Sequence, residues 1–164
     1  MRPQDVLVLL QISLQEHETW TQVDLAQALG MSQSEISASL SRSTYARLLF
    51  DRGRKVQSHA LLNFIQHGLP YAFPQQPGAV QRGLPTAHSA PPLCQEIVSE
   101  EAYVWPSAKG AVRGQSILPL YPSVVPAALA DPALYEVLAL IDAVRVGRAR
   151  ERNLALNLLK AKLL

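Results

Sequence analysis

Cysteine is nearly absent from this chain, since Cys94 is the only one among 164 residues. A single cysteine excludes an intramolecular disulfide. The four histidines (His17, His59, His67 and His88) are scattered along the sequence, and with one cysteine they give no spacing typical of a zinc site. We therefore expect no structural metal and no cofactor.

Long apolar runs are also missing. No stretch reaches the ~18 apolar residues that a membrane span needs, and residues 1–5 lack the layout of a signal peptide. With 48% hydrophobic residues, the sequence predicts a soluble, globular, cytoplasmic protein with no membrane partner. Its length suits one compact domain, or a small domain with a substantial appendage.

Signatures of catalysis are absent as well. There is no glycine-rich phosphate loop, no metal-ligand cluster, and no serine or cysteine nucleophile in a known local context. His88 stands beside two hydroxyls, Thr86 and Ser89, but hydrogen bonding within a loop explains this stretch. Cys94 has no cation next to it in sequence that would activate its thiol. The sequence therefore predicts that the protein is not an enzyme.

Charge is small overall and unevenly distributed. A net charge of +2 does not by itself indicate a nucleic-acid partner. Residues 42–55, however, carry five cations and one acid, which gives a local net charge of +4. The cations are Arg42, Arg47, Arg52, Arg54 and Lys55, and the acid is Asp51. A second basic cluster occupies residues 145–162. A solvated helix face explains these charges as well as a nucleic-acid partner does.

The first third of the chain predicts three helices. In residues 4–15 the apolar side chains recur at helical spacing, which indicates a core helix. Thr21 is suited to cap a second helix and Gly30 to end it in a left-handed conformation. Ser32 and Glu35 form a capping box that starts a third helix only three residues later.

The third helix, expected over residues 33–46, has two different faces. One face would bury Ile36, Leu40 and Ser43. The opposite face carries small hydroxyls, alanine, one arginine and one tyrosine: Ser34, Ser37, Ala38, Ser41, Arg42 and Tyr45. A merely solvated face would favour Glu and Lys. This composition instead indicates close approach to base edges and phosphates.

Turn and breaker residues organise the next segments. Residues 48–57 are typical of a short β-hairpin with a basic tip, and Ser58 is suited to cap a helix that ends near Gly68. Six prolines within residues 69–92 leave no room for regular structure, so we expect an irregular connection there.

The rest of the chain predicts a second hairpin and a long helix. Residues 103–105 and 112–117 would be the two hairpin strands. Asp131 and Pro132 start an apolar helix, which Gly147 either kinks or divides in two.

A helix-turn-helix spacing runs through residues 22–41. Ala26 stands where two helices would cross, Gly30 at the turn, and Ile36 in the core of the second helix. Together with the hairpin, residues 4–66 resemble the phage-repressor helix-turn-helix and the winged-helix regulators of the MarR type. The resemblance implies a winged helix-turn-helix domain that binds double-stranded DNA.

The resemblance also implies which residues contact DNA. The recognition-helix positions are Gln33, Ser34, Ser37, Ala38, Ser41 and Arg42, and the wing positions are Arg52, Arg54 and Lys55. The candidate DNA-binding set further includes Thr21, Ser32 and Tyr45. Gln33 can read adenine, and Arg42 can reach guanine or phosphate. Such regulators often carry longer side chains at the positions of Ala38 and Ser41, so direct base readout would rest on few residues.

We therefore expect a mainly α fold with small β hairpins, in which a winged helix-turn-helix is followed by a proline-rich segment and one or more C-terminal helices. The expected division is a DNA-binding domain over residues 1–68 and a proline-rich connecting segment over residues 69–102. A hairpin and helical region over residues 103–164 would serve dimerisation or partner binding.

These features predict a sequence-specific transcriptional regulator, most simply a repressor. Specific binding must exceed non-specific binding by ~4–10 kcal/mol, which one recognition helix does not supply, so we expect a homodimer that reads two half-sites. The apolar stripe of the last helix is the candidate dimer interface. It comprises Leu134, Val137, Leu138, Ile141 and Val144.

Two alternatives stay open at this point, since winged helices also serve as protein-binding modules. The protein could be an antitoxin or regulatory partner that binds a toxin or effector through residues 69–164. It could also sense a small ligand near Tyr103, Trp105 and Tyr121. The basic hairpin tip favours DNA, because a protein-binding winged helix has no need of three cations within four residues.

Overall fold

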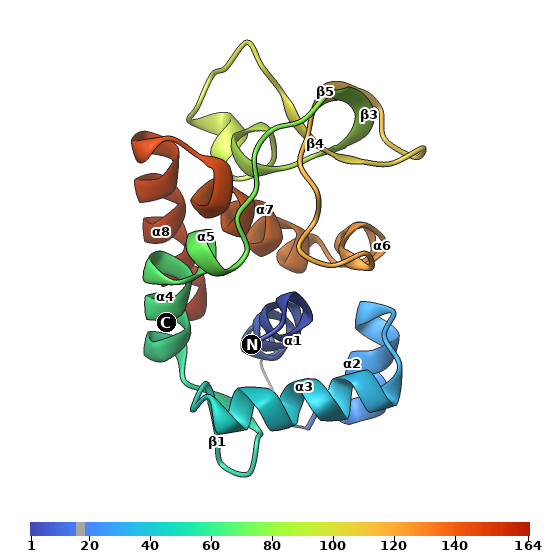
Figure 1. The fold of residues 1–164 in the computed structure, drawn as a ribbon, viewed down its shortest axis with the longest axis vertical. Coiled ribbons are helices and arrows are strands. Elements are labelled where there is room, and N and C mark those ends of the chain that lie inside the picture. The colour runs from blue at the N-terminus through green and yellow to red at the C-terminus, as the bar shows by residue number, and fades with distance from the viewer. Residues whose placement is uncertain (16–18) are drawn as a thin grey trace.

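The computed structural model describes residues 1–15 and 19–164, so His17 lies outside the described residues. The first half contains α1 (Pro3–Ser13), α2 (Gln22–Leu29), α3 (Gln33–Tyr45), β1 (Leu49–Phe50), β2 (Lys55–Val56), α4 (Ser58–His67) and α5 (Leu69–Ala72). The second half contains β3 (Val80–Pro85), short helical turns η1 (Ala87–Ser89) and η2 (Leu93–Gln95), β4 (Tyr103–Pro106), β5 (Val112–Ser116), α6 (Val124–Ala130), α7 (Pro132–Val146) and α8 (Ala149–Leu163). The prediction of a mainly α fold with small β elements is confirmed (Figure 1).

Helix α1 lies at the centre of the molecule. Residues 5–12 are all buried, because α3 packs on one side of the helix and α7 on another (Figure 1). A helix that is enclosed on every side must be apolar nearly all round, which explains the run of valines and leucines in its middle. One hydrophobic core therefore extends from α1 and α2 through to α8.

Local capping chemistry sets the helix ends as predicted. The hydroxyls of Thr21 and Ser32 accept hydrogen bonds from the backbone N–H groups at the third positions of α2 and α3, and Gly30 is left-handed with φ 61°. Asp131 likewise caps α7, and Gly147 divides α7 from α8. Ser58 is the exception, since it is the first residue of α4 and its side chain caps nothing.

Strand β3 overturns two predictions about the second half. Residues 80–85 pair antiparallel with both β4 and β5, while β4 and β5 pair parallel over two positions. Residues 69–92 are therefore not irregular throughout, and residues 103–117 do not form a hairpin. Pro85 and Pro106 are tolerated because they stand at strand ends. Gly83 permits the close approach, since a Cβ there would lie 2.0 Å from the Trp105 carbonyl oxygen.

The apolar stripe of α7 is buried inside its own chain. All five stripe residues (Leu134, Val137, Leu138, Ile141 and Val144) are at most 2% exposed, and α7 packs against α1, α6 and α8. The prediction that this stripe forms a dimer interface was wrong. Helical periodicity identifies a face that must be covered, but it does not say whether the same chain or a second copy covers it.

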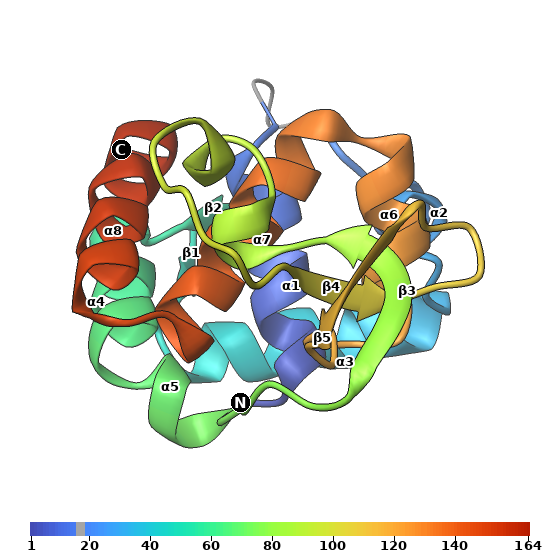
Figure 2. The same ribbon diagram turned by 90° about the horizontal axis from the view of Figure 1, so that it is seen from above.

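A buried ion pair within α7 also hydrogen-bonds to the segments packed around the helix. The Asp142 carboxylate accepts hydrogen bonds from Thr86 Oγ1, Trp105 Nε1 and Arg145 Nη1, at 2.6 to 2.8 Å. Arg145 also donates to the backbone carbonyls of Phe73 and Leu118. Burial raises the pKa of Asp142, while Arg145 and the two other donors oppose that shift. These contacts join the small sheet to the helical core. Figure 2 shows the strands β3, β4 and β5 lying over α7 and α1. None of the helices in the described part of the chain is long and apolar enough to cross a membrane.

Candidate nucleic-acid interface

One face of α3 is exposed along its whole length. It carries six of the residues singled out from the sequence: Gln33, Ser34, Ser37, Ala38, Ser41 and Tyr45. Tyr45, at the end of this stripe, is 93% exposed. The buried face consists of Ile36, Ser39 and Ser43, with Leu40 only half-buried, so the inward face is rotated slightly from the prediction.

Acidic groups are held away from this stripe. Glu35 is the only acid in α3, and its carboxylate accepts hydrogen bonds from the Ser32 backbone N–H and from the hydroxyl of Tyr121, at 3.1 and 2.8 Å. The hydrogen bonds from Tyr121 and Ser32 lower the pKa of Glu35, so the carboxylate is ionised. Its bond to Tyr121 turns it toward the second half of the chain. The exposed stripe is therefore free of negative charge.

Arg42 does not lie on the exposed stripe, which corrects its predicted placement. Its Nε and Nη2 atoms donate to both oxygens of Asp5 in α1, with a shortest distance of 2.7 Å. Asp5 is fully buried, and burial is the largest single effect and raises its pKa. The hydrogen bonds to the carboxylate, led by those from Arg42, together with the charge of Arg42 outweigh burial, so the pKa is lowered. Arg42 therefore fixes α3 onto the central helix. It would have to abandon a buried carboxylate in order to reach a base.

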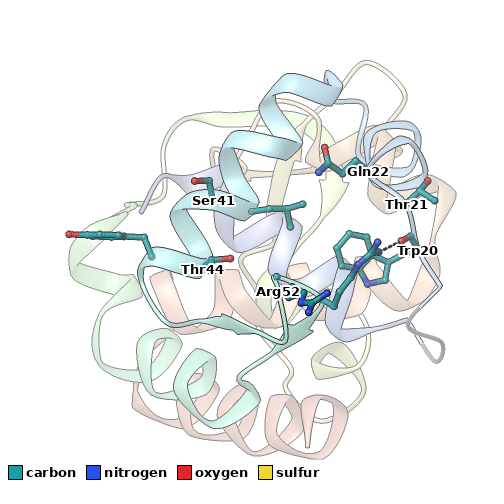
Figure 3. A pocket seen from close by; sticks show the side chains of 10 residues that line it. Trp20, Thr21, Gln22, Ser41, Thr44 and Arg52 are labelled. Atoms are coloured by element: carbon teal, nitrogen blue, oxygen red, sulfur yellow. Dashed lines mark hydrogen bonds between the residues drawn. The ribbon is translucent and has the colours of Figure 1, made fainter.

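A hollow of about 730 Å³ separates α3 from the hairpin and from the start of α2. Figure 3 shows Ser41 and Thr44 on the α3 side and Thr21 and Gln22 on the α2 side, with Arg52 at the hairpin. These walls come from three separate segments, so the hollow exists only after the chain has folded. Thr44 and Gln22 were not among the residues predicted from sequence.

Arg54 ties the hairpin tip to the residues before α2. Its Nη1 donates to the Trp20 carbonyl oxygen at 2.6 Å, and its guanidinium lies 4.8 Å from the centre of the Trp20 ring. Trp20 itself is buried, and Arg54 remains exposed on its outer side. This cation–π contact holds one wall of the hollow in place.

Arg47 adopts a backbone conformation that normally requires glycine. Its φ is 60°, and the N–H groups of Arg47 and Leu48 bond back to the carbonyls of Thr44 and Ser43. These two bonds define a Schellman motif at the end of α3, in which glycine is the usual residue at this position. Sequence reasoning missed Arg47 as a site residue, because arginine gives no local signal for a left-handed turn.

The hairpin tip also contains non-glycine residues with a left-handed backbone conformation. Asp51 and Arg52 have φ values of 49° and 55°, followed by Gly53 at 81°. Within the described residues, the side chains of Arg47 and Arg52 make no hydrogen bond or ion pair. Two arginines with unengaged side chains therefore stand on strained backbone: Arg52 lines the hollow, and Arg47 follows the end of α3 two residues after Tyr45, which also lines it.

The remaining predicted site residues have other contacts. Thr21 and Ser32 use their side chains as helix caps, and Lys55 is half-buried with a contact of its own. In the second basic cluster, Arg145 is buried and Lys162 pairs with Glu136.

The three aromatic residues suggested as a ligand sensor do not meet around one hollow. Trp105 is buried against Asp142, Tyr103 packs edge-on against His88, and Tyr121 reaches α3.

Comparison with known proteins gives no relative. No protein-family model matches the chain, and neither a curated protein nor a solved structure matches it.

Proposed function

We propose that residues 1–68 form a winged helix-turn-helix domain that binds double-stranded DNA, and that the protein is a transcriptional regulator of the repressor type. α3 would enter the major groove, the β1–β2 hairpin would be the wing, and the DNA backbone would pass along the hollow. The observation that carries this proposal is the strained placement of Arg47 and Arg52.

Strain of this kind needs a reason. A left-handed conformation costs a non-glycine residue roughly 1 kcal/mol relative to glycine, and such positions cluster at functional sites. At both positions glycine would relieve the strain, and neither side chain contributes a hydrogen bond or ion pair within the described residues. A phosphate backbone passing the hollow would use both charges, since phosphate contacts supply most of the affinity of DNA-binding proteins.

The exposed stripe of α3 has the shape and chemistry for base contact. Serine and alanine at positions 34, 37, 38 and 41 would let the helix backbone come close to base edges. Gln33 at the first turn can read adenine in a bidentate manner. Arg42 is left out of the proposed contacts because Asp5 occupies its donors.

A homodimer remains part of the proposal. Few side chains on the stripe are long enough for bidentate readout, so two copies reading two half-sites would supply the necessary discrimination. The dimer contact would lie outside α7, whose apolar face is covered within the chain.

A salt series tests the DNA proposal. Affinity for the DNA upstream of the protein's own gene would be compared with affinity for scrambled duplex, for wild type and for an Arg47→Ala/Arg52→Ala variant. We expect tighter binding to the upstream DNA. The slope of log K against log salt should be shallower by about 1.8 in the variant, because each phosphate contact contributes ~0.9.

An Arg150→Ala/Lys160→Ala variant is the matched control, since it removes two exposed charges from α8. Its slope should equal that of wild type if the wing face binds DNA. Weak, equal binding of all three proteins to both duplexes would overturn the proposal.

Arg47→Gly tests whether the charge of Arg47 serves DNA binding or the stability of the fold. The substitution relieves left-handed strain of roughly 1–2 kcal/mol, and the greater freedom of glycine in the unfolded chain offsets about 0.4–1 kcal/mol of it, so the free energy of unfolding should rise by up to about 1 kcal/mol. Affinity for duplex DNA should fall at the same time, because one phosphate contact is lost. Urea unfolding and a binding titration measure the two effects. A loss of stability, or an unchanged affinity, would contradict the assigned role.

A further inference from the structure

We propose that the groove between α6 and residues 107–111, the connection from β4 to β5 that is called the β4–β5 turn below, binds a medium-chain aliphatic carboxylate. We further propose that this ligand weakens DNA binding by α3. The second part rests on the proposed DNA-binding function, whereas the first part does not.

The groove is a distinct hollow of about 690 Å³, away from the α3 face. Its walls are mostly apolar. The apolar lining residues include Pro106, Pro119, Pro122, Val125, Pro126 and Leu129. Leu129 is 52% exposed. The volume lies within the ~300–1,000 Å³ range of small-molecule sites. No aromatic side chain lines the groove in the described part of the chain, so its walls suit an aliphatic chain better than a stacked ring.

The charge at the groove selects the head group. Among the described residues that line it, Lys109 alone is charged, and no contact with its ammonium group is found within the described chain. The turn that carries Lys109 is itself fixed, because the Lys109 backbone N–H donates to Ser107 Oγ at 3.2 Å. A cation at the edge of an apolar groove complements a single anionic group at the end of an apolar chain. These features point to a monocarboxylate.

The far side of the groove wall contacts the helix-turn-helix segment directly. Tyr121 lies between the lining residues Pro119 and Pro122, and its hydroxyl donates to Glu35 Oε1 at the first turn of α3. Ser123 packs against the turn between α2 and α3, where a Cβ on Gly30 would lie 3.6 Å from the Ser123 Cβ. Figures 1 and 2 both show α6 beside α2, and the two helices are in contact.

These contacts provide a physical route from the groove to α3. A chain wedged between the β4–β5 turn and α6 would displace residues 119–126 and loosen their contacts with Glu35 and Gly30. The start of α3 would then lose its support from the second half of the chain. Couplings of this kind change affinity about 5- to 150-fold. We expect octanoate at saturation to weaken DNA binding about tenfold.

The experiment has one arm without DNA and one with it. Calorimetry on the full chain measures binding of octanoate, with octanol as the neutral match, for wild type, Lys109→Ala and the control Lys160→Ala on α8. We expect octanoate to bind wild type and the control equally, and Lys109→Ala about tenfold more weakly. Octanol should bind all three proteins weakly. DNA titrations with and without octanoate are then made on wild type and Tyr121→Phe.

Each result decides one part. Equal octanoate binding by wild type and Lys109→Ala, or no binding at millimolar concentration, overturns the ligand site. Octanoate binding without any change in the DNA affinity of wild type overturns the coupling. Tyr121→Phe should bind octanoate normally, but octanoate should change the DNA affinity of this variant much less than that of wild type. A full tenfold change in the DNA affinity of Tyr121→Phe overturns the assigned route. If no duplex binds any variant, the proposed function fails and the coupling with it, while the calorimetry still decides the ligand site.

Discussion

Asp142→Ala should lower the free energy of unfolding by about 3–5 kcal/mol, which is the range for removing one partner of a buried ion pair. The carboxylate is 2% exposed and accepts hydrogen bonds from Thr86, Trp105 and Arg145. Without it, the Arg145 guanidinium would be a buried charge with no counter-ion, and the Trp105 N–H would lose its acceptor. Because the free energy of unfolding of small domains is only ~5–15 kcal/mol, this single change would remove a large part of it.

Urea unfolding with two further variants checks this result. Asp142→Asn keeps the size of the side chain but leaves Arg145 without a counter-charge, so it should fold and still lose stability. Glu136→Ala removes the carboxylate of an ion pair whose partners are about one-third exposed, and it should lower stability by less than ~1 kcal/mol. Similar losses for Glu136→Ala and Asp142→Asn would show that burial of the Asp142 pair has no special weight.

Ser37→Glu/Ser41→Glu should weaken duplex binding at least 100-fold. Both serines are exposed on the α3 stripe, and carboxylates there would face the phosphates and base edges that the proposal places against it. Like charges brought together at an interface cost several kcal/mol, and each ~1.4 kcal/mol is a factor of ten in affinity. Stability should change little, because glutamate favours helix more than serine does.

The matched control for this variant is Asn153→Glu/Asn157→Glu. It places two carboxylates four residues apart on an exposed face of α8, so the change in net charge is the same. A binding titration at fixed salt should show a loss of affinity several-fold at most. A comparable loss for both double variants would mean that total charge, and not the α3 stripe, governs binding.

Residues whose structure depends on near neighbours in sequence were predictable. Thr21, Ser32 and Asp131 cap helices through hydrogen bonds that reach two or three residues along the chain. Gly30 takes the left-handed turn for which it lacks a steric penalty. The positions of α2, α3 and α7 followed from these signals. The β1–β2 hairpin followed from the pattern of residues 48–57, and most of the exposed stripe on α3 followed from helical spacing.

The candidate site was only partly predictable. Arg42 has the composition and spacing of a DNA-contacting residue, yet its partner Asp5 lies 37 positions away. The strain at Arg47 comes from a Schellman turn that sequence signals assign to glycine. The groove beside Lys109 is built from residues on either side of β5, which no local pattern connects.

The sequence by itself determined most of the longer helices, several of their ends and the basic, acid-poor character of the α3 and hairpin segment, because these depend on hydrogen bonds and side-chain chemistry within a few residues. It did not predict the short helices α5 and α6. Tertiary structure decided what each apolar face covers. Proline and glycine in residues 69–92 predicted an irregular segment, but Gly83 allowed β3 to enter the sheet by close backbone approach. The α7 stripe predicted an interface, but α1, α6 and α8 of the same chain bury it. Burial is non-directional, so the partner of an apolar face is settled only when the whole chain packs.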